Sequence, residues 1–481
     1  MVILTLEAST SSAKAMLYDS IKGPLVTKIV PYDREINNIA TQDCDDICHT
    51  VLAVGRDVAS GYDVKAIALC GTWHSLVVCD RGMRPVTRTY SWAYGDSARE
   101  AAKIRKDRNL ALDLYHRTGC MTHSTYGLYT LLHLKNTGME LRDKFFASQS
   151  GYIFYTMTGE RIESPSTMSG SGLLNVYQKD YDNMILSMLG VEVGQFGRLA
   201  TYRDTFPLLK TVADRLGVKE GTPVIPAYPD GAMNQVGAGA LDKGIMTLSV
   251  GTSAAMRLTV ESPMIPEKPS LWCYVGVDSW VLGAATSGAC SCVDWFRHNM
   301  LNHAISFKTL ERRAVNMEST PVFLPFIFGE RCPGWQEERL GGFFDISPRH
   351  SYASMYRGLL EGICFNLLQC YQALLAVAGE PAQIKLSGGI VNSRFWMQML
   401  ADILMRRIEV SRFEQASSLG TVALALFACG ELTDISDFRV DSYRTIAPHD
   451  GSARIYAEKY DRYLNWYNRT GCDAGAEEGS A

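Results

Sequence analysis

The chain has 481 residues, more than a single hydrophobic core usually serves, so we expect two domains. Its 47 Lys and Arg against 51 Asp and Glu give a formal net charge of -4, which excludes a nucleic-acid footprint and favours a small-molecule partner. The sequence has no signal-like start and no apolar run near the roughly 20 residues that span a bilayer, so we expect a cytoplasmic protein without a membrane segment. Its 13 cysteines include no Cys-x-x-Cys pair, so we expect reduced thiols.

The first half alternates predicted helices and strands. Helical periodicity is expected over residues 43–59 and 97–114, while apolar runs predict strands at 64–70 and 221–227. Residues 238–244 connect the two halves, which places a domain boundary near Gly244.

The second half repeats this alternation. A helix is expected over 352–378, a strand over 384–387, and then a helix, a short strand and a helix at 401–405, 408–410 and 418–429. The end of the chain, from about residue 468, is expected to be a flexible tail. The pattern therefore indicates an α/β fold in both halves.

One segment occurs twice, as Thr5–Ser11 (TLEASTS) and Thr247–Ser253 (TLSVGTS), each after a short apolar run. A strand that enters a Gly, Ser and Thr turn exposes backbone N–H groups and hydroxyls that can wrap a phosphate. Chance recurrence of such turns is the alternative for one copy alone. The shared register of the two copies favours one unit built twice, with a nucleotide polyphosphate between the two domains.

Further motifs give the chain a resemblance to a known family. They are Trp92–Arg99, Ala227–Gly231, Gly329–Pro333 and Leu386–Asn392. On these residues and the two loops, the chain is identified as a member of the FGGY carbohydrate kinase family, over nearly its full length to about Tyr467. The resemblance implies two ribonuclease-H-like domains of the actin and hexokinase type, residues 1–244 and 245–467, with an interdomain ATP cleft and a tail at 468–481.

Phosphoryl transfer needs one well-placed carboxylate to accept a proton late in the reaction. Asp230 follows a strand and precedes a turn, and it matches the catalytic base of the family, whereas the pattern alone also fits an ordinary turn aspartate. Glu7 and Asp230 are the candidate ligands of Mg²⁺, which prefers oxygen donors. Relatives usually carry Asp and Gly where this chain has Glu7 and Ser9, so this chain departs from the family at the metal position.

The resemblance places a sugar site in the first domain. His74 is a candidate hydrogen-bonding residue there, although an isolated histidine after a strand is more often structural. Trp92, Asp96 and Arg99 resemble the sugar-binding tryptophan, aspartate and arginine of relatives, at an altered spacing. An aromatic face with a carboxylate and a guanidinium suits a sugar acid.

Nucleotide contacts are expected from both halves. The candidate residues are Thr10, Ser11, Ser12 and Lys14 in the first half, and Gly251, Thr252, Ser253, Gly288, Gly388, Gly389 and Asn392 in the second. No Walker A sequence is present. Arg331 is expected to pair with Glu330 or another acid and to fix the geometry of the cleft.

The favoured function is ATP-dependent phosphorylation of a small sugar, sugar acid or polyol, with ATP and Mg²⁺ as cofactors. The branch most like this chain is gluconate kinase, and xylulose and autoinducer-2 kinases stay open. A sugar- or nucleotide-binding regulatory pseudokinase and an actin-like ATPase are the alternatives of other classes. A homodimer is one assembly that the resemblance allows.

Overall fold

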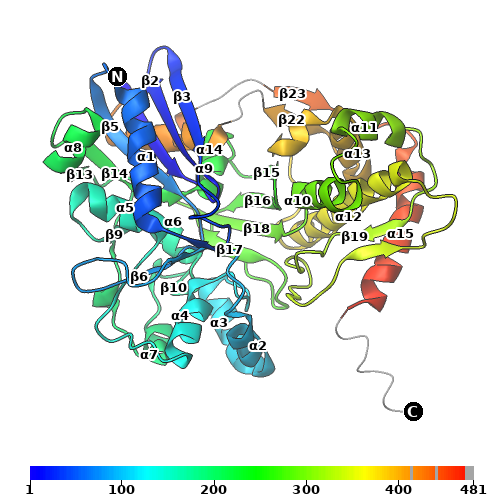
Figure 1. Cartoon of the computed structure of the whole chain (residues 1–481), viewed down its shortest axis with the longest axis horizontal. Helices are drawn as coiled ribbons and strands as arrows, with labels where there is room; N and C mark the ends of the chain where they lie inside the picture. Colours follow the sequence, from blue (N-terminus) through cyan, green and yellow to red (C-terminus); the bar gives the residue numbers. More distant parts are fainter. Residues whose placement is uncertain (412–414, 439–442, 472–481) are drawn as a thin grey trace.

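The computed structural model describes residues 1–411, 415–438 and 443–471, which form two lobes (Figure 1). The first half contains β1 (Val2–Ala8), β2 (Ser12–Asp19), β3 (Gly23–Pro31), β4 (Thr41–Gln42), α1 (Cys44–Ala59), β5 (Val64–Gly71), β6 (Val77–Cys79), β7 (Thr89–Tyr90), α2 (Ala98–Lys106), α3 (Arg108–Thr118), α4 (Gly127–Asn136), β8 (Phe145–Ala147), α5 (Gln149–Thr158), β9 (Ile162–Glu163), α6 (Pro165–Ser169), β10 (Leu174–Asn175), β11 (Asp180–Tyr181), α7 (Asn183–Leu189), η1 (Val193–Gln195), β12 (Arg198–Leu199), β13 (Phe206–Pro207), α8 (Lys210–Leu216), β14 (Pro223–Pro229) and α9 (Asp230–Gly237).

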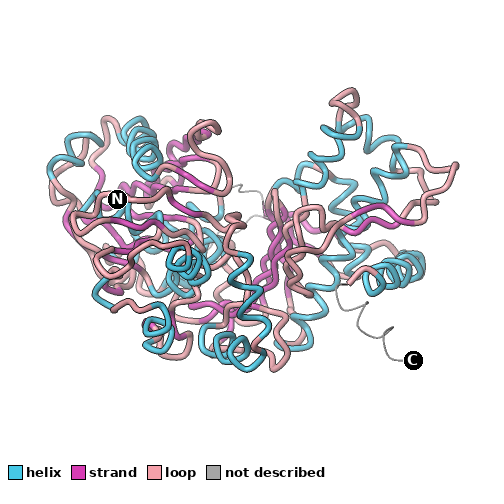
Figure 2. Tube along the Cα trace, turned by 60° about the horizontal axis from the view of Figure 1, so that its bottom comes forward, coloured by secondary structure: helices cyan, strands magenta, loops and turns pink. Residues whose placement is uncertain are grey.

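The second half contains β15 (Ile245–Val250), β16 (Ala254–Val260), β17 (Trp272–Val275), β18 (Trp280–Thr286), α10 (Cys290–Trp295), η2 (Phe296–Met300), α11 (Phe307–Ala314), β19 (Val322–Leu324), β20 (Gly342–Phe344), α12 (Tyr352–Ala378), β21 (Gln383–Ser387), η3 (Gly389–Asn392), α13 (Arg394–Leu404), β22 (Ile408–Ser411), α14 (Ala416–Ala428), η4 (Ile435–Asp437), β23 (Tyr443–Ile446) and α15 (Ser452–Arg469). Helices surround the strands of each lobe (Figure 2).

The two main sheets share one topology. The first has the strand order β13-β14-β5-β1-β2-β3 and the second has the order β17-β18-β16-β15-β21-β22-β23. In the first, β1 is antiparallel to β2 and parallel to β5, and β5 is parallel to β14. In the second, β15 stands in the same relations to β16 and β21, and β21 to β22. The predicted duplication of an α/β unit is therefore confirmed.

Local signals explain most helix boundaries. Asp43 caps α1 by accepting hydrogen bonds from the backbone of Asp45 and Asp46. The segment 97–114, which was predicted to have helical periodicity, is helical and forms two helices, α2 and α3. Asp107 ends α2 and caps α3 by accepting a hydrogen bond from the Leu110 N–H, so this one polar residue divides the segment.

The long helix α12 forms the core of the second lobe. It is long and apolar enough to cross a membrane by length and composition alone, contrary to the expectation from the sequence, but 67% of its most apolar window is buried. A mostly buried core helix passes the same test, and α12 packs on α11, α13 and β19. Every cysteine among the described residues is free, and all except Cys290 and Cys429 are buried, as predicted.

The end of the chain is more ordered than predicted. Helix α15 continues to Arg469, so the tail expected from residue 468 does not begin there. The rest of that expectation, over residues 472–481, lies outside the described residues. Helix α15 packs on β19 and α13.

Two helices cross where the lobes meet. Helix α14 follows β22 of the second lobe, yet it packs on α9, β5 and β1 of the first (Figure 1). A Cβ atom at Gly237 would lie 1.8 Å from the Ala416 carbonyl oxygen, and one at Gly420 would lie 2.0 Å from the Met233 carbonyl oxygen. Only glycine at these two positions allows the backbones of α9 and α14 to approach this closely.

We expect Gly420→Ala to separate α9 from α14, because the added methyl group meets backbone that cannot rotate away. Overpacking of this kind destabilises by roughly 1–3 kcal/mol. Chemical denaturation measures the loss, and Gly194→Ala is the matched control because a Cβ there meets nothing within 4 Å. Equal stability of the two variants would contradict the close crossing.

Candidate active site

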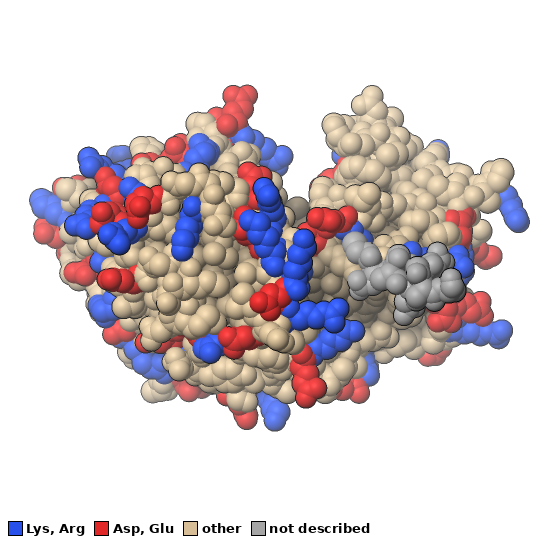
Figure 3. Space-filling view, turned by 90° about the horizontal axis from the view of Figure 1, so that it is seen from below, with Lys and Arg blue, Asp and Glu red and all other residues tan. Residues whose placement is uncertain are grey.

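A cavity of about 100 Å³ lies between the lobes and is lined by both of them. The first lobe contributes Thr10, Thr72, Trp73, His74, Trp92 and Asp230, and the second contributes Ser253, Ala254, Ala255, Arg257, Trp272, Tyr274, Ala285 and Arg331. Figure 3 shows the molecular surface hollowed between the two lobes. The sequence predicted that the sugar site lies in the first domain, whereas residues of both lobes line this cavity.

The two predicted loops are hairpin turns that face the interlobe region. In the first, the Ser9 side chain donates to the Ser12 carbonyl at 2.8 Å, and the Ser9 N–H bonds the same oxygen at 3.1 Å. In the second, the Gly251 N–H donates to the Ser253 carbonyl at 2.9 Å. Ser9 thus closes its turn with its own hydroxyl. Thr10 and Ser253 line the cavity, whereas Ser11, Ser12, Gly251 and Thr252 lie outside its lining.

Asp230 stands at the first residue of α9, directly after β14, where its carboxylate reaches the cavity. Its Oδ1 accepts a hydrogen bond from the Gly231 N–H at 2.6 Å. Burial raises the pKa of this carboxyl group above its usual value, against the opposing effect of the Arg257 guanidinium. A buried carboxylate with a raised pKa in a cleft is well suited to accept a proton.

His74 is held in one tautomer. Its Nδ1 lies 2.5 Å from the Gly170 carbonyl oxygen, so Nδ1 carries the proton and Nε2 is left as an acceptor. Burial, with a further contribution from Arg331, lowers the pKa of His74 to about 3. The imidazole is therefore neutral at pH 7, and the ring can accept a hydrogen bond from a hydroxyl group in the cavity.

Of the predicted sugar-site trio, only Trp92 lines the cavity. Its indole N–H donates to the Thr10 hydroxyl at 3.0 Å, and this hydrogen bond connects Trp92 to the first hairpin turn. Asp96 and Arg99 are exposed at the start of α2 and lie outside the lining. The altered spacing of this motif places them in the turn and the first helical residues that follow, which point to solvent.

Glu7 has a protein partner on each carboxylate oxygen. Oε1 accepts from the Lys14 ammonium at 2.9 Å, and Oε2 accepts from the Ser417 and Ser418 hydroxyls at 2.8 and 3.1 Å. Its carboxylate therefore joins β1 and β2 of the first sheet to the first turn of α14. Lys14, which was expected to offer its charge to phosphate, is paired with Glu7.

The expectation that Arg331 pairs with Glu330 or another acid is wrong among the residues that the structure describes. Glu330 is paired with Arg339 at 3.0 Å, and both side chains are buried. Arg331 instead lines the cavity, as does Arg257 of β16, which the sequence analysis did not single out. The signal that could have found Arg257 is its place two residues along a strand from Ala255, between the buried Met256 and Leu258.

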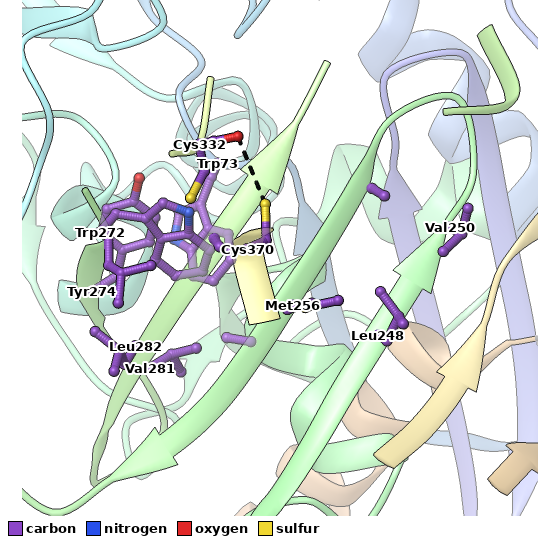
Figure 4. Packing of buried hydrophobic residues seen from close by; sticks show 14 of the residues in the cluster. Trp73, Leu248, Val250, Met256, Trp272, Tyr274, Val281, Leu282, Cys332 and Cys370 are labelled. Atoms are coloured by element: carbon purple, nitrogen blue, oxygen red, sulfur yellow. Dashed lines mark hydrogen bonds between the residues drawn. The ribbon is translucent and has the colours of Figure 1, made fainter. Parts of the chain in front are cut away.

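Three aromatic side chains, Trp73, Trp272 and Tyr274, line the cavity. Figure 4 shows these three rings lying together. Trp272 and Tyr274 are stacked with ring centroids 4.3 Å apart, and Trp73 meets Tyr274 at 5.2 Å. The Trp73 N–H donates to the Ser166 carbonyl at 2.8 Å. Aromatic faces of this kind pack against the C–H surfaces of a polyol.

The predicted adenosine residues lie beside the second loop. Gly388, with φ 93°, approaches the backbone of Val250 so closely that a Cβ would lie 2.5 Å from the Val250 carbonyl oxygen. Gly388, Gly389 and Asn392 are exposed and open to a ligand. Gly288 is buried, and a Cβ there would lie 2.0 Å from the Pro325 carbonyl oxygen, so packing already accounts for this glycine.

Comparison with known proteins gives matches along the chain. The family model described as "FGGY family of carbohydrate kinases, N-terminal domain" matches residues 2–237, and the C-terminal model matches 246–429. The gluconokinase of Bacillus subtilis (strain 168) is 26% identical over 96% of this chain and 95% of its own. The xylulose kinase of the same strain is 25% identical over 97% of each chain.

Solved structures match over a similar extent. The gluconate kinase from Lactobacillus acidophilus superposes with a TM-score of 0.90 at 25% identity, over 97% of each chain. The ligand-bound xylulose kinase from the same organism superposes with a TM-score of 0.91 at 24% identity, over 100% of each chain, which shows a shared fold.

His74 should make the folded protein less stable in mild acid. Its pKa of about 3 lies below the roughly 6.5 of an unfolded chain, so the unfolded state takes up the proton first as pH falls. The His74 contribution is therefore complete above pH 6.5 and declines toward pH 3. His74→Asn, which tolerates the φ of 65°, should show a smaller loss of melting temperature between pH 7 and 5. Parallel curves for both proteins would contradict a buried neutral His74.

Proposed function

We propose, for a chain that belongs to the FGGY family of carbohydrate kinases, that it transfers the γ-phosphoryl group of ATP to a hydroxyl of a small sugar or sugar acid, with gluconate favoured. The observation that carries this proposal is Asp230, whose buried carboxylate lines the cavity between the lobes. A cytoplasmic location is part of the same proposal.

Asp230 is the proposed base. The acceptor hydroxyl oxygen bonds to the γ-phosphorus, the bond from that phosphorus to the β-γ bridging oxygen breaks, and the hydroxyl proton passes to Asp230. ADP leaves with the electron pair of the broken bond. Because the transition state is loose, the proton moves late and the main task of the carboxylate is to orient the hydroxyl.

Several uncharged side chains of the cavity suit a polyhydroxy substrate. His74 offers an acceptor through Nε2, Thr10 offers a hydroxyl, and the rings of Trp73, Trp272 and Tyr274 line the same cavity. Binding between two lobes also excludes water, which would otherwise compete with the sugar as nucleophile.

The nucleotide phosphates are proposed to bind the two hairpin turns, with adenosine near Gly388, Gly389 and Asn392. Among the residues that the structure describes, no group of three or more His, Cys, Asp and Glu is placed to hold a metal ion. Asp230 is the residue that would hold a Mg²⁺ arriving with the nucleotide, and such an ion would neutralise phosphate charge. Glu7 fits less well as a ligand, because both its oxygens already have protein partners.

Xylulose is the second candidate substrate, since xylulose kinases match this chain almost as fully as gluconate kinases. Autoinducer-2 and a role without catalysis are the remaining alternatives. A pseudokinase would draw its support from Glu7 and Ser9, which stand where relatives usually carry Asp and Gly. The structure weakens that support, because the Ser9 hydroxyl closes its turn and the Glu7 carboxylate has defined partners.

Asp230→Asn should lower kcat by roughly 10²–10⁴-fold, since the amide cannot accept the hydroxyl proton. Affinity for ATP, measured by calorimetric titration, should stay nearly unchanged. Asp113→Asn on the exposed face of α3 is the matched control. Wild-type turnover in Asp230→Asn with the accepted sugar would rule out Asp230 as the base.

Glu7→Gln should lower the melting temperature and leave the Mg²⁺ dependence of turnover the same. The change removes the negative charge that faces Lys14, and losing a buried charged partner costs roughly 1–3 kcal/mol. Ser418→Ala, which removes one hydrogen bond to the same carboxylate, is the control. A severalfold rise in the Mg²⁺ concentration for half-maximal rate would instead place Glu7 at the metal.

A further inference from the structure

Two arginine side chains in the cavity have polar atoms without partners. Nε and Nη1 of Arg257 and Nε of Arg331 are buried and make no hydrogen bond to any residue that the structure describes. Arg331 is only 9% exposed, and both side chains line the cavity. No carboxylate in the described chain lies within salt-bridge distance of either guanidinium.

The other buried arginine of the described chain, Arg339, is paired with an acid, and so is the largely buried Arg357. Arg339 meets Glu330 at 3.0 Å, and Arg357 meets Glu361 at 3.0 Å. A buried guanidinium without an acidic partner is unfavourable, because its charge has lost water and gained nothing in return. The pKa of Arg257 reflects this unfavourable environment. Burial and, more weakly, the nearby Arg331 lower the pKa, although Asp230 opposes both effects. The arginine pair of the cavity is therefore the exception that needs a partner from outside the chain.

The side chains that line the cavity carry more positive than negative charge. Arg257 and Arg331 each carry one positive charge, Asp230 supplies one negative charge, and His74 is neutral. Glu7 and Lys14 lie nearby but neutralise each other. The cavity thus holds an excess of one positive charge, which a substrate with one negative charge would cancel.

Arg257 lies close to the start of α9, where Asp230 stands. A Cβ at Gly231 would lie 2.9 Å from Nε of Arg257 and 2.1 Å from a ring carbon of Trp73, so the absence of a side chain at Gly231 brings both close to the start of α9. Arg331 is near enough to His74 to lower its pKa. Substrate hydroxyls and a charged end of the substrate can therefore be bound together within one small cavity.

From these observations we infer that Arg257 and Arg331 bind the carboxylate of the substrate and make the enzyme select a sugar acid over a neutral sugar or polyol. The inference rests on the proposed kinase function and narrows its substrate class. A guanidinium presents donors in a planar fork that matches a carboxylate. A neutral substrate leaves these buried donors unpaired, which is how a polar site rejects an analogue that lacks the matching group.

D-gluconate and D-glucitol test the inference, because they differ only in the carboxylate that replaces a CH₂OH group. The wild-type protein should phosphorylate D-gluconate with a kcat/KM at least about 100-fold above that for D-glucitol. Arg257→Met should lower kcat/KM for D-gluconate by about 10- to 100-fold more than it lowers kcat/KM for D-glucitol, the range for a hydrogen-bonded charge. Arg312→Met, on the exposed face of α11, is the control and should change neither value.

Calorimetric titration of D-gluconate without ATP provides a second readout that does not depend on turnover. Arg257→Met should weaken binding as much as it lowers kcat/KM, and Arg257→Lys, which keeps the charge and loses the fork, should fall between. If the methionine variant does not fold, the titration of the lysine variant alone tests whether D-gluconate binding depends on Arg257.

Equal use of D-gluconate and D-glucitol by the wild-type protein, or equal losses for both in Arg257→Met, would overturn the selection by carboxylate. If the protein phosphorylated no sugar in the presence of ATP, the proposed function would be wrong, which is a different outcome. The titration would still decide the inference in that case, because D-gluconate affinity that depends on Arg257 supports it and affinity independent of Arg257 contradicts it.

Discussion

The crossing of α9 and α14 fixes how the two lobes face each other. Gly237 and Gly420 let the helix backbones touch, and each helix also bonds the first strand of the opposite sheet. Gln235 of α9 bonds the Thr247 hydroxyl of β15, while Ser417 and Ser418 of α14 bond Glu7 of β1. Because β1 and β15 lead directly into the two hairpin turns, the same contacts set the distance between the turns and the position of Asp230.

The site combines tight packing with unbalanced charge. Where the chain needs a fixed structure, its buried charges are paired, as in Glu7 with Lys14 and Glu330 with Arg339. In the cavity they are not, since Arg257 and Arg331 have no acidic partner and Asp230 is buried at a raised pKa. Such groups are unfavourable in the empty protein and become favourable when a ligand supplies the missing hydrogen bonds, which is typical of a binding site rather than of a structural core.

Features set by local sequence were predictable, and features set by distant contacts were not. The two hairpin turns, the duplicated unit and helix α12 follow from apolar patterns and turn residues within short segments. Two of the three partners of Glu7, Ser417 and Ser418, lie about 410 residues away along the chain, so no local pattern shows that its carboxylate joins two lobes. Arg257 resembles an ordinary solvent-facing strand residue until the fold places the other lobe above it. Asp96 and Arg99 were predicted at the sugar site at an altered spacing, and the fold leaves both outside the lining of the cavity.

A crystal structure with D-gluconate and a nonhydrolysable ATP analogue tests the central claim most directly, namely that substrate binds in the cavity shared by both lobes. The account predicts one sugar hydroxyl within hydrogen-bond distance of Asp230 and in line with the γ-phosphorus, with the sugar carboxylate on Arg257 and Arg331. A sugar bound instead at Asp96 and Arg99, with both guanidiniums still unpaired, would contradict it.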